Sequence, residues 1–456
     1  MIQLARRSVP NALRPLIGLL VVLALAAGCG GDDDAGGDPT PATDDQADDD
    51  GEVVDEDTTE PAGGSVDGAL VSVLAFDFGL WALDPAGGQP FEVVVPDVGF
   101  ADRQMPPLTT PDGSTAVLTV FTTLEGQTFS NDVGLGAIDL ATGEGRLVAP
   151  LGQDRADDES TDFNSWELAG VSDTTAWLIE TRSGVDGQAL LAVDLASGTV
   201  ETAVEASESR ARGMTVVEGQ LYGQVDGSIA RLDDGGWESV AVLNDLAFEQ
   251  FLSPSTIADF AITRSGTPVD QAWAESMLTF FDPRPGVAGM VGAGGLLYWQ
   301  FNETWSNAEG TDTAIVGGFI EFDPATASIT GAWPLGTSVG DFPDENEVST
   351  SSQGTWHAIG DTVWFADARD NGDLLRLDPA SGVEAFDIAP IGGADYTQIE
   401  LVPNDPDGVW LILEDWTITE SNDSGTSATG DTRFVLVDPV TGALDLEVDE
   451  SDLIGF

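Results

Sequence analysis

The residues best suited to chemistry in this sequence are oxygen ligands gathered in three stretches, 341–346, 367–373 and 404–408. Carboxylate and amide oxygens are the ligands that Ca²⁺ prefers. The candidate calcium ligands are Asp367, Asp370, Asn371, Asp373, Asp405 and Asp407. Arg369 stands where the third position of an EF-hand loop would supply a ligand. Asp, Asn and Gly also form ordinary turns, so calcium binding and turn formation are both open here.

The chain has one histidine, His357, and one cysteine, Cys29, and it has no lysine. A lone histidine could act as a general base, although most such residues are structural. Without further His, Cys or Lys, the chain cannot build a Ser-His-Asp triad away from His357, a zinc site of the usual ligands, or a Schiff base. We name no catalytic residue, and the sequence favours a protein without catalytic activity.

The N-terminus resembles the signal peptide of a bacterial lipoprotein over residues 1–28. Three arginines precede the apolar run 16–27, which is too short to span a bilayer. The run ends at Ala27-Gly28-Cys29, which is similar to a lipobox. This resemblance implies that Cys29 carries acyl chains, palmitate among them, and anchors the protein to the membrane outside the cytoplasm. An ordinary cleaved signal or a membrane-anchoring helix is the alternative.

Residues 29–68 form a predicted disordered linker that follows the anchor. Its short runs of Asp lie among Gly, Pro, Thr and Ala, with little to bury. The whole chain holds 80 acidic and 15 basic residues, for a net charge of −65. Such a surface repels nucleic acid, so we expect no nucleic-acid partner. We attribute the acidity to a salt-tolerant source rather than to a specific basic partner, and we expect a monomer.

A turn phrase recurs through residues 69–456 and decides the fold. Residues 377–382 read Leu-Asp-Pro-Ala-Ser-Gly, in which Asp can bond the backbone of the turn and Gly supplies a positive φ. The Asp of each copy is one of Asp84, Asp139, Asp194, Asp233, Asp323, Asp378 and Asp438. Repeats at about this spacing are typical of propeller blades. Seven phrases predict an all-β, seven-bladed β-propeller.

Each phrase follows an apolar strand that often carries Trp, as at Trp177, Trp299, Trp364 and Trp410. We expect these tryptophans to be core residues in strands packed on both faces. The first blade, about 69–96, is predicted to be one strand short. Either 70–74 or the C-terminal stretch 452–456 could complete it.

The gap between Asp233 and Asp323 predicts a short helical insertion at about 244–281. Asn244 could cap a helix over 245–251, and Thr267-Pro268 could begin a second one that runs to 278. The stretch 281–286 is similar to the turn phrase, so an eight-bladed propeller is the alternative.

The Trp strand followed by the Asp-Pro-Ala-Ser/Thr-Gly hairpin resembles the repeats of PQQ-like, YVTN (WD40-like) and streptogramin-lyase-like propellers. The Trp that usually follows the phrase in PQQ-like repeats is kept at Trp333 and loosely at Trp237. The missing lysine speaks against a quinoprotein dehydrogenase, and we expect no cofactor other than Ca²⁺. These families include enzymes and scaffolds on one architecture, so the resemblance implies fold more than activity.

The sequence thus favours a lipid-anchored, non-catalytic propeller that binds a protein partner or an envelope ligand on one face. The alternative is a calcium-dependent hydrolase or lactonase with carboxylate ligands in its central channel.

Overall fold

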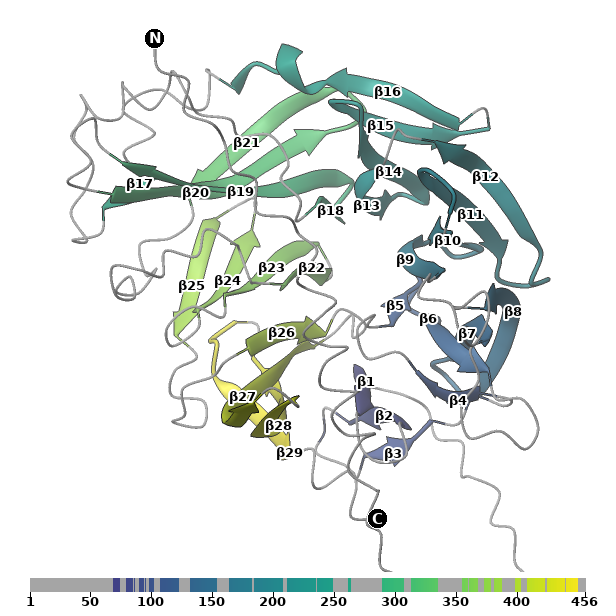
Figure 1. Ribbon diagram of the computed structural model, residues 1–456. Helices are drawn as coiled ribbons and strands as arrows, with labels where there is room; N and C mark the ends of the chain where they lie inside the picture. Colours follow the sequence, from purple (N-terminus) through teal and green to yellow (C-terminus); the bar gives the residue numbers. More distant parts are fainter. Residues whose placement is uncertain are drawn as a thin grey trace, which may run out of the picture. The chain divides into compact units, whose positions relative to one another are not determined.

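The computed structural model describes residues 69–449 with gaps, the widest at 154–163, 249–260, 264–288, 335–354 and 388–397. In this part of the chain, six antiparallel sheets have four or five strands each (Figure 1). The first sheet has strands β4 (Val98–Ala101), β5 (Leu108–Thr109), β6 (Thr115–Thr122), β7 (Asp132–Asp139) and β8 (Gly145–Gln153). The second has β9 (Ser165–Val171), β10 (Thr175–Thr181), β11 (Gln188–Asp194) and β12 (Val200–Ser207). The third has β13 (Arg212–Val217), β14 (Gln220–Val225), β15 (Ser228–Asp233) and β16 (Gly236–Val242).

The other three sheets follow in chain order. The fourth sheet has strands β17 (Ala261–Thr263), β18 (Val291–Ala293), β19 (Leu296–Ser306), β20 (Thr313–Asp323) and β21 (Ser328–Pro334). The fifth has β22 (Thr355–Ile359), β23 (Thr362–Asp367), β24 (Asp373–Asp378) and β25 (Gly382–Asp387). The sixth has β26 (Gln398–Val402), β27 (Val409–Asn422), β28 (Gly425–Val437) and β29 (Leu444–Asp449). The protein is therefore an all-β propeller with six complete blades.

The predicted seven blades, and the alternative of eight, are both wrong. The phrase at Asp84 belongs to a sheet of three short strands in the described chain: β1 (Ala69–Val73), β2 (Gly79–Leu83) and β3 (Phe91–Glu92). β1 pairs with β2 as the first strand of this sheet. Residues 452–456, the other predicted completing strand, lie outside the described residues. The phrase marks a hairpin, and a hairpin does not require a four-stranded sheet around it.

Apolar side chains join each sheet to the next one along the chain. Leu80 and Ala82 of β2 share a cluster with Ala116 and Leu118 of β6, whereas Leu83 packs with Trp410 of β27. The three-stranded sheet therefore lies between the first and the last complete blade. The predicted core role of the Trp strands is confirmed, since each of their tryptophans is buried: Trp177, Trp299, Trp364 and Trp410.

Each four-stranded blade runs up and down, which gives it two ends. The turns between first and second and between third and fourth strands lie at the turn end, and the connection between second and third strands lies at the loop end. The first strands of neighbouring blades contact one another: β9 contacts β13, and β18 contacts β22. At the turn end, Leu140 N donates to Ser114 O (3.0 Å) and Leu195 N to Thr174 O (2.9 Å), so the two turns of one blade are joined.

The helical insertion predicted at about 244–281 is wrong where the structure describes it. The chain forms a single 3₁₀ turn at Leu243–Asp245, and the side chain of Asn244 does not cap a helix. Leu243 is buried, and Leu246 and Phe248 pack against the neighbouring core. The burial of these apolar residues outweighs local helix propensity, and the chain forms only this short turn. β17 pairs with the edge of β20, and the predicted helix at 267–278 lies outside the described residues.

Contacts divide the chain into two units: residues 63–415 with 431–456, and residues 1–62 with 416–430. All of the sheets lie in the first unit, apart from the end of the β27–β28 hairpin. Among the described residues, no helix is both long and apolar enough to cross a membrane.

Candidate functional site

The β23–β24 hairpin places two predicted calcium ligands opposite each other. Asp367 ends β23, Asp373 begins β24, and the two are register partners. The other candidates lie outside the described residues: Asp370, Asn371, Asp405 and Asp407. Within the described ranges, no group of three or more His, Cys, Asp or Glu side chains could hold a metal ion. Cys29 also lies outside the described residues, so its acylation stays a prediction.

His357 lies on β22, the first strand of its blade, opposite Trp364. Part of its surface remains exposed, yet the surrounding atoms displace enough water to lower the pKa of the imidazole to about 4. The ring is therefore neutral at neutral pH. No carboxylate among the described residues pairs with it to form an acid–base couple.

The Asp residues of the turn phrase hold turns, as predicted. Asp194 Oδ1 accepts hydrogen bonds from Ala196 N (3.1 Å), Ser197 N (2.7 Å) and Ser197 Oγ (2.8 Å), and these bonds lower the pKa of Asp194. Asp438 accepts two similar backbone bonds. Gly198 and Gly442 take the expected positive φ, both +70°. The carboxylates of Asp194 and Asp438 are thus occupied by their own turns.

A buried carboxylate that the sequence did not reveal lies in the sheet of β17–β21. Glu321 is 7% exposed and accepts hydrogen bonds from Tyr298 Oη (3.1 Å) and Thr330 Oγ1 (2.7 Å). Burial, and then the neighbouring negative charge, raise the pKa of Tyr298. Because the carboxylate is buried with two donors, we assign this group to stability.

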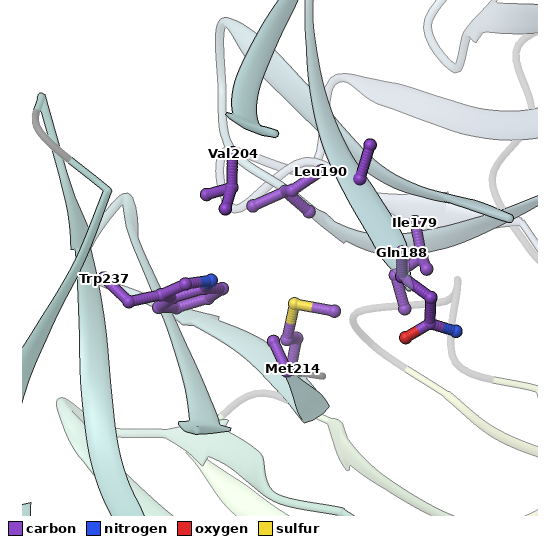
Figure 2. A pocket seen from close by; sticks show the side chains of 8 residues that line it. Ile179, Gln188, Leu190, Val204, Met214 and Trp237 are labelled. Atoms are coloured by element: carbon purple, nitrogen blue, oxygen red, sulfur yellow. The ribbon is translucent and has the colours of Figure 1, made fainter. Parts of the chain in front are cut away.

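An open apolar hollow, which we call the groove, lies between the sheet of β9–β12 and the sheet of β13–β16. It is lined by Ile179, Gln188, Ala189, Leu190, Val204, Ala211, Met214 and Trp237. Figure 2 shows Leu190 and Val204 facing Trp237 and Met214 across it. Its free volume is ≈ 20 Å³, room for about one water molecule. The groove suits part of an inserted side chain better than a small-molecule substrate.

The strand pairing explains how one wall of the groove is built. Ile179 of β10 is the register partner of Leu190 of β11, and Leu190 is the partner of Val204 of β12. Opposite residues of antiparallel strands point to the same face of a sheet. A row of three aliphatic side chains therefore faces the next blade. At the loop end, β14 and β15 are joined by Asp226-Gly227 alone, whereas residues 182–187 join β10 to β11.

Glu167 extends this row at its inner end. It lies on β9 opposite Ile179, so its side chain shares the face that lines the groove. Glu167 is exposed, yet atoms crowd around it, and the loss of water raises the pKa of its carboxyl. No hydrogen bond or ion pair joins it to another described residue.

Arg212 of β13, on the side of the opposite wall, points away from the groove. A bulge lies in β13 between Arg212 and Thr215, so Arg212 pairs with Gln224 and shares a face with Tyr222, away from the groove. Arg182 pairs with the buried Glu180 (2.9 Å), the register partner of Trp166 on the other face of its sheet. None of the residues that line the groove is charged. Glu167 lies on the same face at the inner end of the row, and Glu201, the register partner of Ala192, lies on that face of β12. The sequence signalled only Trp237, as a Trp after a turn phrase.

Among known proteins, similarity is found with solved structures. No protein-family model matches the chain, and no curated protein matches it. Solved structures similar to it include a prolyl endopeptidase (11% identity, TM-score 0.40, 83% of this chain and 46% of that one). Others are the dihydro-heme d1 dehydrogenase NirN (11%, 0.38, 85% and 74%) and an oligogalacturonate lyase in complex with manganese (12%, 0.39, 77% and 84%). The chain spans about half the length of the peptidases that it matches, and at these TM-scores the matches carry no argument about activity.

Proposed function

We propose that this protein is a non-catalytic, lipid-anchored propeller that binds a protein partner outside the cytoplasm. The observation that carries the proposal is the groove, a small open hollow with mostly apolar lining between two neighbouring sheets. Partly exposed apolar side chains around a small hollow are typical of protein interfaces, where an inserted side chain supplies much of the affinity. The Trp strands and Asp turns support a repeat of the PQQ-like, YVTN or streptogramin-lyase-like kind.

Site-specific photo-crosslinking in cells tests this function. A photo-reactive amino acid at position 188, on the rim of the groove, should give discrete adducts with a partner. The same group at position 174, in an exposed turn at the turn end, is the matched control. Adducts that form equally from both positions, or from neither, would contradict a binding role for the groove.

The anchor is tested separately by the intact mass of protein extracted from membranes. Wild-type protein should carry acyl chains on Cys29, and Cys29→Ser protein should be released unmodified. An unmodified, soluble wild-type product would remove the anchor from the proposal and leave the groove untouched.

A calcium titration tests the alternative enzyme. A rise in melting temperature with Ca²⁺ that Asp367→Asn and Asp373→Asn abolish would favour a carboxylate-bound metal and count against the non-catalytic reading.

A further inference from the structure

We propose that the groove binds a lysine or arginine side chain of the partner, with its methylene stem on the apolar row and its charged head on Glu167. This inference rests on the proposed function and specifies its partner: a basic segment of a protein. Two features of the groove carry it, namely the geometry of the row and the single charge at the row's end.

The geometry matches the shape of a long basic side chain. Glu167, Ile179, Leu190 and Val204 are successive register partners across four strands. Neighbouring strands lie about 4.8 Å apart, so a stem that lies across Ile179 and Leu190 reaches the carboxylate of Glu167 within one side-chain length. Lysine and arginine side chains commonly lay their stems on apolar surface while the head reaches a polar site.

The charges around the groove match as well. Glu167 is the only charged residue of this row, and no cation among the described residues pairs with it. Among the described residues of the flanking strands, the basic residues Arg212 and Arg182 lie on other faces. A carboxylate that has lost part of its hydration without gaining a partner interacts favourably with an incoming cation. Trp237 adds an aromatic face to the opposite wall, which suits a basic side chain.

The groove is small and open, so an occupant would lie along its apolar row rather than inside an enclosed cavity. We expect one extended side chain of the partner on the row, with neighbouring residues of the partner on the sheet edges beside it.

The first experiment selects peptides from a random dodecapeptide display library on full-length wild-type protein. A groove-blocked variant, Ala211→Trp, serves for counter-selection. Selected peptides should contain a Lys or Arg that is needed for binding. Selection on Glu167→Gln should lose this basic preference, and selection on Glu205→Gln, which removes one exposed acid from β12, should keep it.

The second experiment measures the pairing directly by calorimetry with the best peptide and its Lys→norleucine analogue, which keeps the stem and removes the charge. Wild-type and Glu205→Gln proteins should bind the norleucine analogue about tenfold more weakly at low salt. Glu167→Gln should bind both peptides alike. Circular dichroism of each variant confirms that it is folded.

The outcomes separate the two proposals. Peptides that bind wild type but not the groove-blocked variant, and that show no preference for Lys or Arg, would overturn this inference and leave the proposed function standing. A basic preference that survives in Glu167→Gln would also overturn it, because the long-range charge of the protein would then be the cause. If no selected peptide distinguishes wild type from the blocked variant, both proposals fail.

Discussion

The backbones of Gly213 and Gly289 touch across two neighbouring blades, and neither leaves room for a side chain on the other. A Cβ on Gly213 would lie 2.1 Å from the Cα of Gly289, and Met290 N donates to Gly213 O at 3.2 Å. Gly213 lies in the bulge of β13, with φ +53°. The same bulge turns Arg212 away from the groove. The contact leaves no room to insert a side chain between the two blades at this point.

Gly213→Ala should destabilise the protein well beyond the cost of its left-handed backbone. The backbone conformation alone costs about 1–2 kcal/mol for alanine, and the clash with backbone atoms adds about 1–3 kcal/mol. Gly219→Ala is the matched control, because Gly219 has φ +76° and nothing within 4 Å of its Cβ position. Chemical denaturation of both variants measures the difference. Equal losses would show that the two blades can move apart without cost.

Local chemistry explains which parts of the fold could be predicted from the sequence. The Asp turns and the Trp strands follow from interactions within a few residues of each other. The number of complete blades does not, because the phrase at Asp84 forms its hairpin in a sheet of only three described strands. Asn244 had the right chemistry for a helix cap, but the burial of Leu243 and the packing of Phe248 accompany a single 3₁₀ turn instead of a helix.

The groove could not be predicted for a different reason. Its residues come from positions 179 to 237 and from two sheets, and only the packing of one blade on the next brings them together. The relation between Glu167 and Ile179 depends on a strand register, and that register contains a bulge between Trp177 and Leu178. A sequence pattern does not specify such a register.

Removing the hydroxyl of Tyr298 should cost stability, although the ring stays in place. Tyr298→Phe leaves the buried Glu321 with Thr330 as its remaining hydrogen-bond donor among those described. An under-satisfied buried acceptor costs about 1–3 kcal/mol. Denaturation of Tyr298→Phe, Thr330→Val and the double variant should show that the two losses are not additive. Additive losses would mean that the two hydrogen bonds to Glu321 are not coupled to each other.

His357 should make stability depend on pH between about 4 and 6.5. The folded protein holds the pKa of the ring at about 4, below its ordinary value of 6.5, so the unfolded chain binds a proton first as the pH falls. Stability is therefore lost as the pH falls from 6.5 towards 4. This loss is absent from His357→Gln.

The measurement is the free energy of unfolding of both proteins at pH 7.5 and pH 5. Wild type should lose about 2 kcal/mol more than His357→Gln over this interval. Comparing the two proteins at the same pH cancels the contribution of the carboxylates to stability, because both proteins have the same carboxylates. Equal losses would show that water reaches the ring freely.

Glu167 should reduce stability at neutral pH while it serves binding. Its pKa is raised in the folded state, so the folded protein holds the proton more tightly than the unfolded chain, and stability falls as the pH rises through the two pKa values. The cost is therefore present above the raised pKa and absent at acid pH, where the group is protonated in both states. Glu167→Gln should therefore melt at a higher temperature than wild type at pH 7, and this gain should vanish at pH 3.

Glu205→Gln removes the same charge from an exposed site on β12 and controls for the general relief of repulsion in an acidic chain. If Glu167→Gln instead lowers the melting temperature at pH 7 relative to Glu205→Gln, the carboxylate already has a favourable partner within the protein, and the groove has no free charge to offer a basic side chain. A gain in stability that accompanies the loss of lysine binding is the combination expected of a residue kept for function at a cost in stability.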